Sequence, residues 1–408
     1  MDQLALLARL AWRNLWRHKR RTLLILFALA LGIWSMVTMG ALTLGSLEQQ
    51  LTKSIENLIG HVQLHAPGYR DDPVIEHSFA APDARLRRAL AQAEITAWAA
   101  RVRVPAVVAS ERESAGVTVV GIDPAAEIGL SFIGAAVKQG RYLESPQDAG
   151  LLLGRKLAER LETGIGRRVV LMSQDVDNSV ADRGFRVVGI FDGTPESMES
   201  AYLFIGRDAA QSLLKLDTHV SEIAVMTPDR ARLDDVVARL RDAAPSLDVQ
   251  PWTVLEPLLT VSENVTNVIL LIWYVIVFAA MSFGLVNTLL MAVYEHTREF
   301  GLVQALGMPP RRLLGQVMIE SLVLLALALV LGNLLAAANI YWLRDGLDLT
   351  AFAQGLELVG VSPVIYPNVA RDDVLAANGL VFILGLAASL YPAWRASRRV
   401  PVEAITRA

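Results

Sequence analysis

The sequence of 408 residues contains no cysteine, so it holds neither a disulfide nor a thiol-based site. It also lacks the Gly-x4-Gly-Lys-Ser/Thr loop that cradles ATP phosphates, and it has no Gly-x-Ser-x-Gly, His-Glu-x-x-His or paired-cysteine motif. With no catalytic constellation in view, we predict that the chain is not an enzyme by itself. No metal or cofactor is expected on it, and no nucleic-acid partner.

Charge is scarce as well: Asp, Glu, Lys and Arg make up 19% of the residues, whereas 53% are apolar. Each charge-free run reaches the roughly 20 residues that a helix needs to cross a bilayer. The first is too long for a signal peptide, whose apolar region has about 7–15 residues. We therefore predict a multi-pass membrane protein. The runs are Thr22 to Leu47, Asn264 to Tyr294, Ser321 to Leu343 and Val374 to Trp394, and the predicted spans are 22–47, 264–294, 313–343 and 374–394.

The flanking charges predict the orientation, because Lys and Arg favour the cytoplasmic side. Basic residues crowd residues 1–21 and recur at 295–312 and 395–408, whereas 344–373 is mainly acidic. We therefore expect both termini in the cytoplasm, and both the loop 344–373 and the long segment 48–263 on the opposite side of the membrane.

Segment 48–263 is long enough for its own core and mixes strand and helix patterns. An α+β domain inserted between the first two spans is predicted, in one or two lobes. Both ends carry apolar residues at helical spacing, around Leu44 to Ile59 and Leu255 to Val268, which predicts two stalk helices. The expected strands are Arg101–Val108, Val117–Ile122, Arg168–Met172, Phe185–Phe191 and Glu222–Met226, and the expected helices Arg155–Leu161, Arg207–Leu216 and Ala231–Ala243.

Residues 1–21 predict an in-plane helix at the membrane surface. Between Leu4 and Trp16 one face is apolar, and a second is basic with tryptophans beside it, which suits the headgroup layer. A plain extension of the first span is the alternative. The candidate interfacial residues of the in-plane helix are Trp12, Arg13, Trp16 and Arg17.

Two sets of polar residues have competing interpretations. His61, Gln63 and His65 alternate as on one face of a strand, which fits a metal site or, more commonly, a solvent-exposed strand face. We expect the exposed face. Glu320 near the start of the third span indicates either a structural contact with Arg311 or Arg312 or a proton relay, and we favour the contact.

The strongest signal lies at 295–312, where the second span leaves its apolar run through charged residues and ends at a Pro-Pro pair. A short helix with one charged and one apolar face suits docking into a groove of a soluble partner. Helix-surface ion pairs are the alternative. The predicted docking residues are Glu295, Arg298, Glu299, Phe300, Gly301, Leu302, Ala305, Leu306 and Gly307.

This segment, Tyr294 to Met308, resembles the coupling motif of the FtsX/MacB-like permeases of ABC transporters. Tyr391 to Ala396 with Val400 to Ile405 resembles their C-terminal signature. Leu153 to Leu161 and Phe185 to Phe191 look like core pieces of their MacB-like periplasmic domain. The resemblance implies a dimer, either homomeric or with a paralogue, and two copies of a separate ABC ATPase that holds ATP and Mg. The implied mechanism is mechanotransmission, in which ATP-driven closure in the cytoplasm moves the stalks and outer domains.

Within that family, Gly60 to Tyr69 is most similar to lipoprotein-releasing (LolC/LolE-type) permeases. That resemblance implies extraction of lipoproteins from the inner membrane to a periplasmic carrier. A MacB-like efflux permease with an adaptor and an FtsX-like activator of a cell-wall hydrolase stay open. The implied carrier contact falls near Met172 to Gly184, here short, polar and free of proline, at Ser173, Gln174, Asp175 and Asp177. The candidate contacts for a lipid anchor are Met36, Met39, Leu42, Ile269 and Trp273.

Overall fold

A computed structural model describes residues 13, 16–17, 19–193, 196–228, 230–295, 302, 309–352 and 362–397. The chain forms two compact units. The membrane unit comprises Met1–Gln49 and Ser262–Ala408, and the outer unit comprises Gln50–Val261. Each is described by itself below.

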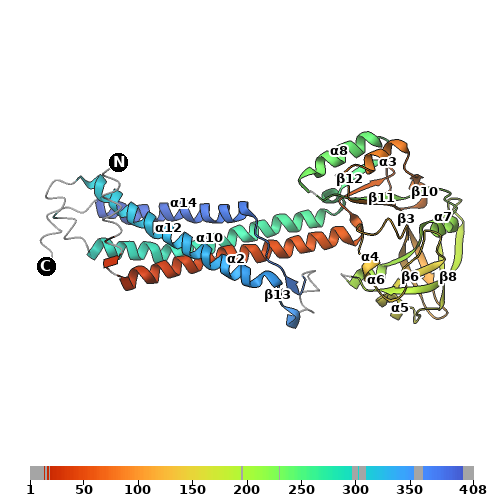
Figure 1. Cartoon of the computed structure of the whole chain (residues 1–408), viewed down its shortest axis with the longest axis horizontal. Helices are drawn as coiled ribbons and strands as arrows, with labels where there is room; N and C mark the ends of the chain where they lie inside the picture. Colours follow the sequence, from red (N-terminus) through yellow and green to blue (C-terminus); the bar gives the residue numbers. More distant parts are fainter. Residues whose placement is uncertain are drawn as a thin grey trace. The chain divides into compact units, whose positions relative to one another are not determined.

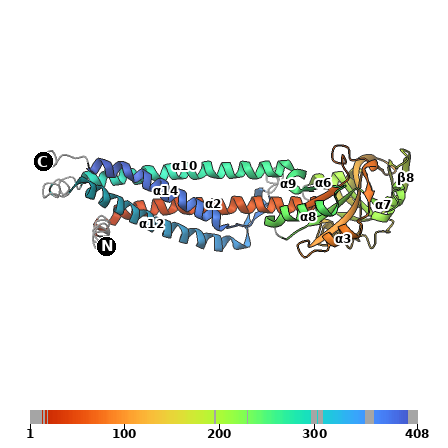
Figure 2. The ribbon, with the colours of Figure 1, turned by 90° about the horizontal axis from the view of Figure 1, so that it is seen from above.

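The membrane unit is built from four long helices that are apolar enough to cross a bilayer, as the charge-free runs predicted. Figures 1 and 2 show them running alongside one another, with α12 and α14 in extensive contact. Between α12 and α14 the chain forms a two-stranded ribbon of β13 (Leu347–Asp348) and β14 (Val364–Ile365). The helices are α2 (Lys19–Ser54), α10 (Pro257–Glu295), α12 (Pro310–Trp342) and α14 (Arg371–Ser397).

Close helix packing in this unit depends on small residues, as is usual where lipid surrounds the helices. A Cβ at Gly32 would lie 2.0 Å from the sulfur of Met281, so the absence of a side chain on α2 leaves room for this methionine of α10. A Cβ at Gly332 would lie 2.8 Å from the carbonyl oxygen of Ala30, which brings α12 equally near to α2.

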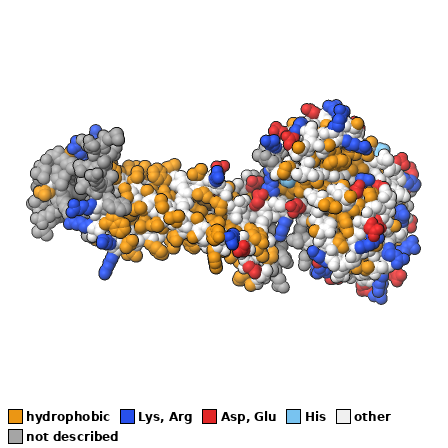
Figure 3. Space-filling view, in the orientation of Figure 1, with side chains coloured by type: hydrophobic (Ala, Val, Ile, Leu, Met, Phe, Trp, Pro, Cys, Tyr) orange, Lys and Arg blue, Asp and Glu red, His pale blue; other side chains and the backbone are white. Residues whose placement is uncertain are grey.

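Hydrophobic side chains predominate on the face of the described helices that Figure 3 shows. Large side chains on α10 stay exposed, for example Phe283 at 78%. Such a surface is stable in lipid, which is as apolar as the side chains themselves, and not in water.

The outer unit contains one large sheet with strand order β12-β1-β11-β3-β4-β9-β6-β8-β5, and β7 pairs with β3 and β8. A two-stranded sheet joins β2 (Phe79–Ala80) to β10 (His219–Val220). The strands of the large sheet are β1 (Val62–His65), β3 (Ala97–Ala109), β4 (Ser114–Ile122), β5 (Val137–Gly140), β6 (Gly150–Gly154), β7 (Arg168–Gln174), β8 (Val180–Phe191), β9 (Tyr202–Gly206), β11 (Glu222–Met226) and β12 (Asp248–Pro251).

Helices flank this sheet. Asp83 caps the first of them by accepting the backbone N–H of Leu86. A π-helical turn, η1 (Ile55–Ile59), continues directly from α2. The helices are α3 (Ala84–Leu90), α4 (Ile133–Ala136), α5 (Arg155–Arg160), α6 (Glu196–Ala201), α7 (Arg207–Leu214), α8 (Leu233–Ala243) and α9 (Trp252–Leu255).

The five strands and three helices expected from sequence all form. The short strands β6 and β9 were not expected, because β6 is buried along its whole length and β9 along all but its first residue, and neither shows an alternation of apolar and polar residues.

The long strand β3 changes partner in its middle. Its residues 97–101 pair with β11 and its residues 102–109 pair with β4. Arg101 therefore lies where the two halves of the large sheet meet. A large apolar core packs on the second half, and a smaller cluster includes Phe132, Phe191 and Phe204 in edge-to-face contact.

Candidate functional site

The expected docking segment follows α10, and contacts at and just before its first residue join α2, α10, α12 and α14. Arg21 of α2 donates to Glu295, the last residue of α10, at 2.8 Å. The Arg395 guanidinium of α14 lies 5.6 Å from the centre of the Tyr294 ring. Val293, Val317 and Ala393 pack together at the same level. The helix ends before this segment are therefore tied to one another by charge, cation–π and apolar contacts.

Of the predicted docking residues, Glu295 and Leu302 are described, and Leu302 is helical and exposed. Arg298, Glu299, Phe300, Gly301, Ala305, Leu306 and Gly307 lie outside the described residues. The same holds for Trp12 of the expected interfacial helix, whereas Arg13, Trp16 and Arg17 are helical, with both arginines exposed. Glu320 lies within α12 and is half-buried.

The candidate contacts for a lipid anchor divide into two groups. Met39, Ile269 and Trp273 are exposed, and Leu42 is half-buried, so lipid can reach them. Met36 is different: only 1% of it is exposed, and it packs among the four helices. The expectation of a lipid-facing position is wrong for Met36, because its place on the helical turn points this side chain toward the other helices.

The histidine strand was also placed on the wrong kind of surface. His61, Gln63 and His65 are buried, because β1 lies between β11 and β12 instead of facing solvent. His65 Nε2 lies 2.9 Å from Gln63 Oε1, so the two side chains satisfy each other. Among the described residues no group of three or more His, Cys, Asp or Glu side chains could hold a metal.

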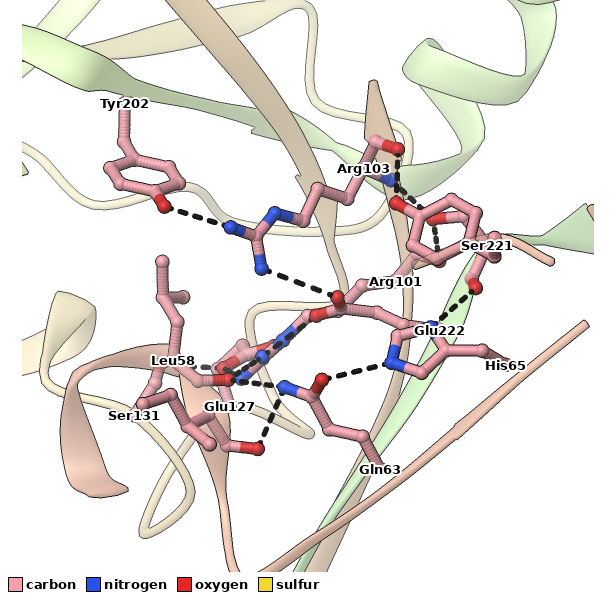
Figure 4. A network of polar contacts seen from close by, with 12 residues as sticks. Leu58, Gln63, His65, Arg101, Arg103, Glu127, Ser131, Tyr202, Ser221 and Glu222 are labelled. Atoms are coloured by element: carbon pink, nitrogen blue, oxygen red, sulfur yellow. Dashed lines mark hydrogen bonds and ion pairs between the residues drawn. The ribbon is translucent and has the colours of Figure 1, made fainter. Parts of the chain in front are cut away.

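The centre of the outer unit is a buried ion network around Arg101, shown in Figure 4. Its guanidinium donates to both oxygens of Glu127 at 2.7 and 2.9 Å, and to Glu222 Oε1 at 3.1 Å. Exposure is 0% for the Arg101 side chain and 1% for each carboxylate. Ser131 adds a hydroxyl donor to Glu127 at 2.5 Å. Bidentate geometry and extra donors offset much of the cost of burying these charges.

Arg101 also holds the end of the first stalk helix. Its Nη1 donates to the carbonyl oxygen of Leu58 in η1 at 2.5 Å. The backbone N–H of Phe132 donates to the Glu56 carbonyl at 3.0 Å, which adds a second link to the same turn. Carbonyls at a helix end have no intrahelical donor, so a guanidinium is an effective cap.

The start of the second stalk helix has a similar arrangement. Arg70 donates to the carbonyl oxygens of Val254 and Leu255, each at 3.2 Å, where α9 ends before α10 begins. Two arginines thus fix the two stalk ends to the sheet domain.

The network continues to Arg103, which bonds the Tyr202 hydroxyl at 2.8 Å and lies 3.6 Å from Glu222 Oε2. Burial alone would raise the pKa of Glu222, but the guanidiniums of Arg103 and Arg101 hold it below its ordinary value. Burial lowers the pKa of His65, which stacks on Tyr69 at 4.9 Å, so this imidazole stays neutral.

The expected carrier contact is the β7–β8 hairpin. Asp175 at its turn is buried and accepts the backbone N–H groups of Asp177 and Ser179 as well as Lys215 Nζ. Its carboxylate is thus used within the hairpin, whereas Gln174 and Asp177 are exposed and Ser173 donates to the Pro105 carbonyl. Val180, beside the turn, is 79% exposed.

Sequence reasoning missed a basic pair on the same hairpin. Arg168 and Arg186 are directly opposite each other on β7 and β8, and both are exposed. Like charges directly opposite on neighbouring strands destabilise a sheet. Such a pair is more stable against an acidic partner surface.

Arg101 was assigned to a strand but to no site. A signal was present, because a charged residue in the apolar run Ala97 to Val108 implies either an edge position or a buried partner. The partners Glu127 and Glu222 lie 26 and 121 positions away, so sequence spacing alone could not identify them.

Two family models match the chain: the MacB-like periplasmic core domain over residues 22–243, and the FtsX-like permease C-terminal region over residues 271–401. The chain therefore belongs to the FtsX/MacB-like permease family of ABC transporters.

Curated relatives are similar at low identity. The lipoprotein-releasing system transmembrane protein LolC of Xylella fastidiosa is 24% identical over 70% of this chain and 71% of its own length. LolE of Haemophilus influenzae is 24% identical over 97% of this chain and 98% of its own. The pyoverdine export ATP-binding/permease protein PvdT of Pseudomonas fluorescens is 23% identical over 97% of this chain, which spans 58% of PvdT.

One solved structure, the periplasmic region of MacB from Actinobacillus actinomycetemcomitans, covers 52% of this chain and 98% of its own. Its identity is 11% and its TM-score is 0.36.

Proposed function

We propose that this chain is the permease subunit of a bacterial inner-membrane transporter that extracts lipoproteins or other lipid-anchored molecules. A separate ATPase, in two copies with ATP and Mg, would supply the energy. A second permease, either another copy or a paralogue, would complete the membrane part. Both termini would lie in the cytoplasm and the outer unit in the periplasm.

The observation that supports this mechanism best is the continuity of α2. This helix begins at Lys19, beside the Arg21–Glu295 pair, and runs without a break to Ser54. The π-turn that follows it is held by Arg101 through Leu58. A stiff helix with a fixed contact at each end transmits a displacement along its axis, which is what mechanotransmission requires.

A further observation supports lipoprotein extraction: LolE of Haemophilus influenzae, which is named as a lipoprotein-releasing system protein, aligns with 97% of this chain. The sequence holds no phosphate-binding loop, so ATP hydrolysis is assigned to a partner. Met39, Ile269 and Trp273 would meet the acyl chains of a client.

Transfer to a soluble carrier would use the β7–β8 hairpin. The exposed Arg168–Arg186 pair and Val180 would contact an acidic carrier surface with an apolar centre. Gln174 and Asp177 would lie at the rim of that contact.

Affinity purification from native membranes in mild detergent tests the proposal. Retention of an ATPase together with a lipoprotein or a soluble carrier is the expected result. An ATPase with a membrane-fusion adaptor would replace extraction by efflux, and an ATPase with a cell-wall hydrolase would replace it by signalling. If no ATPase were retained, the proposal that this permease works in an ATP-driven complex would be wrong.

Charge reversals separate the two contacts. Glu299→Lys is expected to release the ATPase but keep the carrier, and Arg168→Glu with Arg186→Glu is expected to do the reverse. Glu144→Lys, on an exposed carboxylate of the outer unit, is the matched control and should retain both partners. Loss of both partners in either variant would contradict the assignment of separate surfaces.

A further inference from the structure

A cavity of about 460 Å³ lies in the outer unit, against the ion network. Its walls include Leu58 and Ile59 from the end of the first stalk and Leu255 and Leu259 from the start of the second. The network supplies polar lining through Arg103 and Glu222. Sites for small ligands have volumes of roughly 300–1,000 Å³, so this cavity is large enough for a specific ligand.

The charges that line the cavity balance. Arg70 and Arg103 contribute positive charge, and Glu222 and Glu256 contribute negative charge. His65, also in the lining, is neutral because burial lowers its pKa. Attraction and repulsion therefore nearly cancel for a ligand with a single net charge, whereas a neutral ligand with strong dipoles can place its positive end at a carboxylate and its negative end at a guanidinium.

One atom of the lining lacks a hydrogen bond. Glu222 Oε2 is buried and has no hydrogen-bond donor among the described residues, because its closest cation, Arg103 Nη1, stands off at 3.6 Å. The other oxygen of this carboxylate already bonds Arg101. A buried acceptor without a donor is destabilising, so an N–H group from a ligand would be favoured there.

Acceptor and donor lie side by side at this point. Next to Glu222, Arg103 carries further N–H groups that can donate to a ligand. The Tyr202 hydroxyl oxygen accepts a hydrogen bond from Arg103, so its own O–H can donate to a ligand as well. A ligand that offers both an N–H and a C=O satisfies this pair, whereas an amine or a carboxylate satisfies only half of it.

We propose that this cavity binds a short extended peptide segment through its backbone amides, with Glu222 accepting and Arg103 or Tyr202 donating. Apolar side chains of the segment would rest on Leu58, Leu255 and Leu259. The site does not depend on the lipoprotein proposal, because any polypeptide client or a free peptide offers the same amides. Since its walls come from both stalk ends, stalk movement would change its affinity.

Binding of a neutral model peptide to the full-length protein in lipid nanodiscs tests the site. The probe is N-acetyl-Ala-Leu-Ala-Leu-amide, compared with the same peptide bearing a free amine and with one bearing a free carboxylate. By isothermal titration we expect the neutral peptide to bind about fivefold or more tighter than either charged form. Equal or tighter binding of a charged form would overturn the amide assignment.

A pair of neighbouring variants locates the binding. Leu259→Trp fills the cavity and is expected to weaken binding about tenfold or more. Leu258→Trp, on a side chain that is 78% exposed and outside the lining, should leave binding unchanged. Tyr202→Phe, which keeps the ring, should weaken binding by a smaller factor. Wild-type affinity in Leu259→Trp with an unchanged melting temperature would overturn the proposal.

Photo-crosslinking in cells distinguishes the source of the peptide. Benzoylphenylalanine replaces Met198, which lines the cavity. Crosslinks mapped by mass spectrometry to one extended segment of a client protein would identify a tethered segment, and crosslinks to short free peptides would identify a peptide ligand. Crosslinks to lipid alone would overturn the peptide class.

Discussion

The two units stabilise their interiors in opposite ways. In the outer unit, Arg101 is fully buried and joined to the carboxylates of Glu127 and Glu222. In the membrane unit, α12 and α14 are instead joined by a reciprocal pair of neutral amides. Asn333 donates to Asn378 Oδ1 at 2.8 Å, and Asn378 donates back to Asn333 Oδ1 at 3.1 Å.

The difference follows from what each unit must satisfy. A membrane helix satisfies its own backbone, and a charge at bilayer depth is costly, so neutral side-chain contacts are enough. The outer unit must hold a helix end, a loop and two strands together at one point. A guanidinium with several donors can do so, whereas an apolar side chain would leave the Leu58 carbonyl with only the long contact from Gln63 Nε2 at 3.5 Å.

The largest effect is expected at the ion network. Arg101→Met leaves Glu127 buried without its cation and Glu222 with only Arg103 at 3.6 Å, which should cost about 3–5 kcal/mol of unfolding free energy. Denaturant unfolding of the full-length protein in detergent measures it. Arg112→Met, which removes only an exposed ion pair with Glu162, is the control and should cost far less, because solvent screens an exposed pair. Equal losses in the two variants would remove the distinction between buried and exposed charge.

A smaller effect depends on pH. Burial, followed by the charge of Arg230, lowers the pKa of His61 to about 4 from the ordinary 6.5. The unfolded state therefore binds more protons between these values, and stability should fall as the pH drops from 6.5 toward 4. His61 Nδ1 accepts the backbone N–H of Thr227, which a protonated ring cannot do. Melting temperatures at pH 7.5 and pH 5 measure the effect.

The matched variant for this pH dependence is His61→Gln, which keeps a hydrogen-bond acceptor but does not titrate. Its melting temperature should change less than that of the wild type between the two pH values. If the melting temperature of His61→Gln changed with pH as much as that of the wild type, the pH dependence would come from other groups.

The amide pair of the membrane unit should contribute less. Asn333→Leu is expected to cost about 0.6–2 kcal/mol, because hydrogen bonds between membrane helices have modest net values. The remaining Asn378 keeps its bond to the Val374 carbonyl. A double-mutant cycle with Asn378→Leu, followed by thermal unfolding in detergent, isolates the coupling. A coupling as large as the loss in Arg101→Met would contradict the contrast between the units.

The smallest effect is expected at the helix ends. The Arg21–Glu295 pair is partly exposed, at 25% and 37% of the side chains, so Arg21→Ala should cost no more than about 1 kcal/mol. If the pair instead matters for docking the ATPase, stimulated ATP hydrolysis should fall while stability is kept. Exchange of the two residues, Arg21→Glu with Glu295→Arg, should restore hydrolysis. No restoration would mean that Glu295 acts without Arg21.

Local pattern predicted much of the fold. Alternation and β-branched residues located strands such as Phe185–Phe191, because a half-buried strand repeats every two residues. The same rule found the strand that contains His65 but placed its polar face in solvent. Which strands flank β1 is decided by chain segments 160 or so positions away, as the pairing of Val62 with Val225 illustrates. A pattern within one segment carries no such information.

The sequence by itself determined that four helices cross a membrane, because the absence of charge over such lengths leaves few stable alternatives. It also determined that the segment between the first two has a core of its own. Only the tertiary structure decided that Met36 faces the bundle and that Arg101 meets Glu127, Glu222 and Leu58. The physical reason is that a buried charge is stable only with partners at hydrogen-bond distance, and the fold brings those partners from distant parts of the chain.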